Sequence, residues 1–294
     1  MALSTKQGTM MQKTGCVISD GFQLQYIIDG EGLPTIVVGS ALYYERTFSK
    51  HLRTQLKMAF LDHRGFAPGN HCTDLEKYRL EVLVDDIEVM RKALGFEQFV
   101  LIGHSGHTFM ALEYAKKYPA NVTHLVLMCS SPDFSEAGRT AADRYLEDSV
   151  CPERKAVLAA NLARLPQAMA AAPNRAFVTY CLLMGPRNWF DFNFNATELW
   201  AGIEVNMPMF DYVWGEVFRD IDITKNLELV TMPVWLALGR YDYQVPPAYL
   251  WEPVREKFNN LTVRVFERSS HNPHCEEPAL FDAELLGWIL KNSD

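Results

Sequence analysis

Three residues with the chemistry of a nucleophile, an acid and a base lie far apart in the sequence, each just after a strand-like run. Ser105 stands in Gly-His-Ser-Gly-His at 103–107, where a buried strand ends and a helix begins. A serine on such a turn projects its hydroxyl above the sheet, and the following backbone amides point at whatever binds there. Asp242 and His271 follow two later strand-like runs. Because a serine needs a base and the base needs an orienting acid, these residues predict a Ser-His-Asp triad.

The elements that must position these residues alternate between strands and helices. Short runs rich in β-branched and aliphatic residues are mostly followed by segments with helical spacing. This alternation predicts an α/β fold, with a mostly parallel sheet and helices on both faces. Ligands bind at the carboxyl ends of such strands, which is where all three candidate residues lie. We expect an antiparallel hairpin at 16–28, strands at 35–38, 57–61, 99–102, 122–128, 234–238 and 261–266, and helices at 44–56, 75–94, 109–118, 249–258 and 278–291.

The alternation stops after Pro132 and resumes near Pro233. The interval contains alanine-rich helical sequence at 155–172, followed by many aromatic residues. An inserted helical layer must bury a core of its own, so most of these aromatic side chains belong to that core and a minority line an apolar pocket. We therefore predict the first part of an α/β core at 1–132, a helical cap at 133–222 and the second part of the core at 223–294, with Trp189, Trp200 and Trp214 as pocket residues.

The composition limits the classes of partner. The chain has 294 residues, of which 48% are apolar, and its formal net charge is −8. A chain this apolar can bury a large core, and an acidic chain without long runs of Lys or Arg lacks the positive surface that binds nucleic acid or anionic lipid. We expect a small-molecule substrate, no nucleic-acid partner and no membrane partner, and we leave a homodimer open.

The cysteines and the N-terminus bear on the cofactors and the compartment. The six cysteines form no CxxC pair and show no spacing typical of a zinc site, so we expect reduced thiols and no metal. Residues 1–15 are polar and lack the apolar stretch of a signal peptide. No run in the chain approaches the roughly 18 apolar residues of a membrane helix. We therefore expect a cytoplasmic protein.

Four segments carry recognisable motifs: GHS at 103–105 with ALEYAKKYP at 111–119, DHRG at 62–65, GRYDYQVPP at 239–247 and HNPHCEEP at 271–278. Together they resemble the capped α/β-hydrolases, a superfamily that includes serine esterases, lactonases and proline-iminopeptidase-like enzymes. The resemblance implies cleavage of an ester, lactone or amide bond through an acyl-enzyme, without a metal or an organic cofactor. It also implies an oxyanion hole built from the backbone amides of Ser40 and Gly106.

The chain departs from this family pattern at two places. The family usually has His-Gly where this chain has Val38-Gly39, so the loop that presents the Ser40 amide is built differently. The family usually has glycine at the fifth position of the elbow, where this chain has His107. Two interpretations of His107 stay open: a packing histidine whose polar atoms are satisfied, or a side chain that hydrogen-bonds to the cap or the substrate.

The acid of the triad and the type of reaction each admit more than one assignment. Asp133 follows the strand before the cap and could serve as the acid in place of Asp242. A serine at the elbow, where dehalogenases and epoxide hydrolases carry aspartate, argues against those two reactions. An esterase is the first expectation. The runner-up is a proline-iminopeptidase-like aminopeptidase whose cap acids bind a free amine, and a third candidate is a receptor-like ligand-binding protein with slow turnover. The candidate cap acids are Glu198, Glu204, Asp211 and Glu216.

Overall fold

One eight-stranded sheet forms the centre of the molecule. The computed structural model describes residues 12–293; residues 1–11, which include most of the polar N-terminal stretch, and residue 294 lie outside this range. The strand order is β1-β2-β4-β3-β5-β6-β7-β8; β1 and β2, and β2 and β4, pair antiparallel, and the other neighbours pair parallel. The predicted α/β fold with a mostly parallel sheet is confirmed. The strands are β1 (Lys13–Ser19), β2 (Phe22–Asp29), β3 (Leu33–Gly39), β4 (Leu56–Asp62), β5 (Phe99–His104), β6 (Val122–Met128), β7 (Val234–Gly239) and β8 (Leu261–Phe266).

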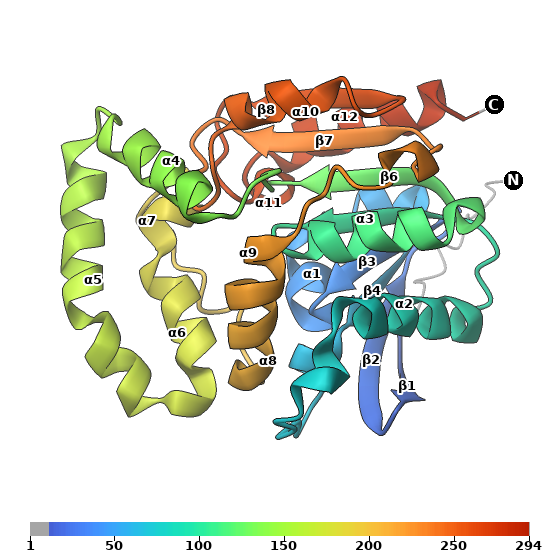
Figure 1. Ribbon diagram of the computed structural model, residues 1–294, viewed down its shortest axis with the longest axis horizontal. Helices are drawn as coiled ribbons and strands as arrows, with labels where there is room; N and C mark the ends of the chain where they lie inside the picture. Colours follow the sequence, from blue (N-terminus) through green and yellow to red (C-terminus); the bar gives the residue numbers. More distant parts are fainter. Residues whose placement is uncertain (1–11, 294) are drawn as a thin grey trace, which may run out of the picture.

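Helices cover both faces of this sheet. Helices α2 (Leu80–Leu94) and α3 (His107–Lys117) pack side by side on one face, and α12 (Pro278–Lys291) lies on the other (Figure 1). Strand β5, between β3 and β6, is buried along its whole length. A strand covered on both faces reads as a continuous apolar run rather than an alternating one, which is the pattern of residues 99–102. This central strand leads directly into the Ser105 turn.

The helix expected at 44–56 is wrong at both ends. The structure has α1 (Ala41–Thr47), followed by a separate 3-10 turn at Leu52–Thr54. The hydroxyl of Ser49 accepts the Leu52 amide at 3.2 Å and donates to the Asp282 carboxylate at 2.5 Å. Serine that bonds the backbone in this way offers the chain an alternative to a continuing helix, so the helix ends before Ser49.

Two other expected helices are interrupted. The segment 75–94 contains a 3-10 turn and then α2, separated by Arg79, whose backbone is extended (ψ 145°). The segment 249–258 contains a 3-10 turn at Ala248–Trp251 and the single turn α10 (Glu252–Arg255). The helices expected at 109–118 and 278–291 agree with α3 and α12 to within two residues at each end.

A helical segment separates β6 from β7 in the chain. In Figure 1 the arrowheads of β6 and β7 point toward this segment, which therefore lies beyond the carboxyl ends of the parallel strands. The boundaries predicted for the cap, 133–222, fall in the connections on either side of it. No helix within residues 12–293 has the length and apolar character needed to cross a membrane. The segment comprises α4 (Glu136–Glu147), α5 (Pro152–Ala171), a 3-10 turn (Pro173–Arg175), α6 (Ala176–Leu183), α7 (Gly185–Asn188), α8 (Met207–Tyr212), a π-helical turn (Val213–Val217) and α9 (Phe218–Asp220).

Candidate active site

Ser105 occupies a sharp turn between β5 and α3. Its φ of 56° is in the left-handed region, which a residue other than glycine seldom adopts and which tends to occur at functional sites. Its amide donates to the Met128 carbonyl at 2.8 Å, which anchors the turn to β6. The turn is tight on both sides: a Cβ at Gly103 would lie 2.6 Å from the His107 carbonyl oxygen, and a Cβ at Gly106 would lie 2.4 Å from the Trp214 indole nitrogen. This geometry presents the Ser105 side chain outward from the sheet.

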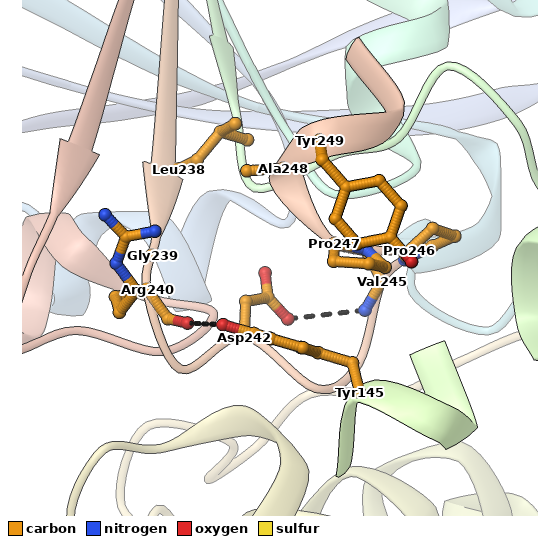
Figure 2. A pocket seen from close by; sticks show the side chains of 10 residues that line it. All are labelled: Tyr145, Leu238, Gly239, Arg240, Asp242, Val245, Pro246, Pro247, Ala248 and Tyr249. Atoms are coloured by element: carbon orange, nitrogen blue, oxygen red, sulfur yellow. Dashed lines mark hydrogen bonds between the residues drawn. The ribbon is translucent and has the colours of Figure 1, made fainter. Parts of the chain in front are cut away.

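Asp242 and His271 form a buried pair. His271 Nδ1 lies 2.8 Å from Asp242 Oδ2, and both side chains are less than a tenth exposed. The other carboxylate oxygen of Asp242 accepts the amides of Gln244 at 3.0 Å and Val245 at 3.3 Å, the second of which is drawn in Figure 2. One oxygen of the carboxylate is thus fixed by backbone amides, and the other faces the imidazole. A neutral imidazole that donates its Nδ1–H to this carboxylate has an unprotonated Nε2. This is the form that a general base requires.

The second candidate for the acid, Asp133, makes a different contact. Its carboxylate accepts the Ser135 amide at 2.8 Å, just before α4. The structure therefore brings Asp242, and not Asp133, to the ring of His271.

Ser105 and His271 line one cavity of about 490 Å³ between the strand ends and the helical segment. Its wall is largely aromatic, with two methionines, a cysteine and one valine, and it also carries the amide side chains of Asn188, Gln244 and Asn272. The three tryptophans named from the sequence, Trp189, Trp200 and Trp214, all lie on this wall. Of the four candidate cap acids, Asp211 lies on the wall. The remaining apolar lining consists of Phe66, Phe134, Met169, Phe177, Cys181, Met207, Phe210 and Val245.

The two amides expected to form an oxyanion hole belong to the residues that precede α1 and α3. Ser40 is the N-cap of α1 and Gly106 the N-cap of α3, and within residues 12–293 neither amide donates to a protein acceptor. The next amide, that of Ala41, donates to the Asp62 carboxylate at 2.6 Å and fixes the connection between β3 and α1. Burial raises the pKa of Asp62 to about 7, although the Ala41 amide favours its ionised form.

Gly39 is required by the way this loop is built. Its φ is +149°, and a Cβ there would lie 2.2 Å from the ring of Tyr44. The Tyr44 ring therefore packs directly on the backbone before Ser40.

Within residues 12–293, one group of three side chains has the proximity of a metal site. The ligand atoms of His104, Cys129 and His271 lie within 4.8 Å of one another. Both ring nitrogens of His104 are already hydrogen-bonded, to the Tyr44 hydroxyl at 3.0 Å and to the His271 carbonyl at 2.6 Å. Nδ1 of His271 faces Asp242. These ring atoms take part in hydrogen bonds that hold the site together.

Comparison with known proteins identifies the family of the chain. The family described as alpha/beta hydrolase fold matches residues 31–278 of the chain. The chain belongs to this family. It is 39% identical over 279 residues to the AB hydrolase superfamily protein YclE of Bacillus subtilis (strain 168), a match that covers 95% of this chain and 99% of that protein.

Solved structures of other α/β-hydrolases share the fold. The proline iminopeptidase of Mycobacterium smegmatis matches with a TM-score of 0.70 and 19% identity, over 96% of this chain and 98% of that one. The esterase EaEST from Exiguobacterium antarcticum matches with a TM-score of 0.66 and 18% identity, over 92% of this chain and 96% of that one.

In this α/β-hydrolase one carboxylate near the His271 loop was not anticipated from the sequence. Glu276 accepts the amides of Phe190 at 2.5 Å, Ser270 at 2.9 Å and Asn272 at 3.0 Å. Burial raises its pKa to about 7, against the effect of these three donors. Glu276 ties the loop that carries the base to the helical segment. Its place in HNPHCEEP was visible in the sequence, but nothing there distinguished it from the neighbouring Glu277.

Proposed function

We propose that this α/β-hydrolase is a serine hydrolase that cleaves an ester, lactone or amide bond of a small, largely apolar substrate. The observation that carries the proposal is the buried contact between His271 Nδ1 and Asp242, with His271 and Ser105 on the wall of the same cavity. An imidazole oriented by a carboxylate beside a strained serine is an arrangement that activates a hydroxyl for attack on a carbonyl.

The reaction then follows in two halves. Ser105 Oγ attacks the carbonyl carbon while His271 Nε2 takes the hydroxyl proton, and Asp242 stabilises the imidazolium. The amides of Ser40 and Gly106 stabilise the negative oxygen of the tetrahedral intermediate. His271 gives its proton to the leaving alcohol or amine as the bond to the carbonyl carbon breaks, which leaves an acyl-Ser105 ester. Water, deprotonated by His271, attacks this ester, and His271 gives that proton to Ser105 Oγ as the bond to the acyl carbon breaks and the acid product leaves.

The cavity favours an apolar ester as the substrate. Its volume of about 490 Å³ accommodates a small molecule, and its wall is largely aromatic. A neutral ester carries no charge that would lose its hydration in this cavity, whereas a charged group would need an oppositely charged partner there. An esterase is therefore the function we put first.

One observation supports an aminopeptidase as the second candidate. Asp211 is the one Asp or Glu side chain among the residues that line the cavity in the described range, and its carboxylate could pair with the free amine of a peptide substrate. The structural similarity to a proline iminopeptidase points in the same direction. The other candidate cap acids do not line the cavity, so an aminopeptidase activity would depend on Asp211.

A panel of chromogenic substrates tests the two candidates. We expect p-nitrophenyl esters of short and medium acyl chains to be hydrolysed with much higher kcat/KM than Pro- or Ala-p-nitroanilide. The variant Asp211→Asn should leave ester hydrolysis within about twofold. Faster cleavage of the anilides, lost in Asp211→Asn, would instead support the aminopeptidase.

Trp200 is expected to limit the length of the substrate chain. Its ring lies 4.4 Å from that of Tyr43 and 5.7 Å from that of Phe177 on the cavity wall. Trp200→Ala should raise the ratio of kcat/KM for p-nitrophenyl octanoate to that for the acetate, since each newly buried CH₂ adds about 0.8 kcal/mol, or roughly fourfold. Tyr249→Ala, an exposed aromatic outside this cavity, is the control. An unchanged ratio in Trp200→Ala would mean that the chain binds elsewhere.

A further inference from the structure

Three buried histidines and a tyrosine form a continuous chain of hydrogen bonds that ends at the backbone of the base. His63 Nε2 lies 3.1 Å from His107 Nε2, and His107 Nδ1 lies 3.0 Å from the Tyr44 hydroxyl. The same hydroxyl lies 3.0 Å from His104 Nδ1. His104 Nε2 lies 2.6 Å from the carbonyl oxygen of His271. We call these four side chains the histidine–tyrosine chain.

The two ends of this chain fix where every proton lies. At one end His104 Nε2 faces a carbonyl, so it carries a proton, and the unprotonated Nδ1 of a neutral His104 then accepts a hydrogen bond from the Tyr44 hydroxyl. The Tyr44 oxygen in turn accepts from His107 Nδ1–H, which also faces the His104 carbonyl oxygen at 3.1 Å. At the other end the Gly65 amide donates to His63 Nδ1 at 3.0 Å, so His63 carries its proton on Nε2 and donates to His107 Nε2. These hydrogen bonds can all form only with His63 and His104 as Nε2–H tautomers and His107 as the Nδ1–H tautomer.

All three histidines are held in the neutral form. Burial keeps the pKa of His63 and His104 well below the usual range and lowers that of His107 to about 4. A second proton on His63 or His107 would place two N–H donors face to face, and one on His104 would leave the Tyr44 hydroxyl proton without its acceptor. Neutrality also matters for the reaction, because the His104 ring lies 4.7 Å from the His271 ring and a positive charge there would oppose the imidazolium that forms on His271.

We propose that the histidine–tyrosine chain positions the catalytic base relative to the nucleophile and the Ser40 loop. Its members come from the end of β4, from α1, from the end of β5 and from the first turn of α3, and these elements carry or adjoin Ser40 and Ser105. This inference rests on the proposed function, because it assigns positioning residues for the same reaction. It also gives His107 a role beyond packing: its ring replaces the usual glycine and joins His63 to Tyr44.

The tautomers are tested directly by long-range ¹H–¹⁵N spectra of ¹⁵N-histidine-labelled wild-type protein at pH 7.5, with signals assigned through single His→Gln variants. We expect His107 as the Nδ1–H form and His63 and His104 as the Nε2–H form. An Nε2–H form of His107, or a doubly protonated ring among the three, would overturn the proposal. This readout does not require any turnover.

The positioning role is tested with Tyr44→Phe, which removes the central hydroxyl and keeps the ring on Gly39. We expect kcat for an ester to fall about 10- to 100-fold with KM within about twofold, because a displaced base costs rate rather than binding. Tyr114→Phe is the matched control, since it removes a buried hydroxyl bonded to Glu88 at 2.8 Å, away from the cavity. Equal kcat in folded Tyr44→Phe and wild type would overturn the positioning role.

Covalent labelling separates this failure from failure of the proposed function. A fluorophosphonate reacts with an activated serine, so its rate of reaction with Ser105 reports on base and nucleophile together. Wild-type protein that is not labelled would contradict the proposed function. Labelling of Tyr44→Phe at the wild-type rate, with wild type labelled, would contradict only the positioning role.

Discussion

Replacing Asp242 by asparagine is expected to lower kcat for ester hydrolysis by about 10⁴-fold, the size of loss seen when a triad carboxylate becomes an amide in other serine hydrolases. One oxygen of Asp242 accepts two backbone amides and the other accepts His271 Nδ1–H. An asparagine whose oxygen keeps the backbone contacts turns its NH₂ group toward His271. The imidazole then has to carry its proton on Nε2, and it can no longer accept the proton of Ser105.

The comparison variant for this prediction is Asp133→Asn. Its side-chain oxygen can still accept the Ser135 amide, so we expect activity within about twofold of wild type. Steady-state kinetics with p-nitrophenyl acetate measure both variants. Near wild-type activity in Asp242→Asn together with a large loss in Asp133→Asn would show that the acid has been assigned to the wrong residue.

Replacing His274 by leucine is expected to raise the free energy of unfolding, by more at pH 4.5 than at pH 7.5. His274 is fully buried among Phe48, Phe281 and the ring of Tyr44, and neither of its ring nitrogens has a hydrogen-bond partner within residues 12–293. A buried polar group without a partner costs about 1–3 kcal/mol, so a leucine of similar volume should raise the free energy of unfolding at pH 7.5 by about 1 kcal/mol.

The acid part of this prediction follows from protonation of the unfolded chain. Burial lowers the pKa of His274 to about 3, below the ordinary value of 6.5. Between these values the unfolded state binds a proton that the folded state does not, so this histidine lowers stability as the pH falls below 6.5. At pH 4.5 the loss amounts to about 3 kcal/mol, at 1.36 kcal/mol for each pH unit.

Urea unfolding at pH 7.5 and pH 4.5 measures both parts of the prediction. The difference between His274→Leu and wild type should grow by about 3 kcal/mol between these pH values. The exposed His71 provides the control His71→Gln, which we expect to follow the wild-type curve. A His274→Leu protein that loses as much stability in acid as wild type would contradict the destabilising role assigned to His274.

The sequence sufficed to predict the architecture because its strongest patterns are local. Strand β5 is a continuous apolar run, and α12 presents its apolar residues at helical spacing, so both were predicted within two residues of their observed ends. The end of α1 was not predicted, because the hydroxyl of Ser49 bonds to Asp282, 233 residues further along the chain. A contact at that separation leaves no periodic signal near Ser49.

The candidate site also has a part that the sequence predicts and a part that it does not. Ser105, Asp242 and His271 could be named because each follows a strand, and parallel strands bring their carboxyl ends to one edge. The contacts of His107 could not be named, since His63 is 44 and Tyr44 is 63 residues distant from it. Only the fold brings these side chains together, and it places His107, the unusual residue at the elbow, between His63 and Tyr44 in the hydrogen-bond chain.

Labelling with a fluorophosphonate, followed by intact-mass measurement and peptide mapping, tests the central claim most directly. We expect a single adduct on Ser105 of the folded wild-type protein and no adduct on folded Ser105→Ala. A receptor-like binding protein without an activated serine would stay unlabelled. Folded wild-type protein that fails to react, or Ser105→Ala that still reacts at the wild-type rate, would contradict the assignment of Ser105 as the nucleophile.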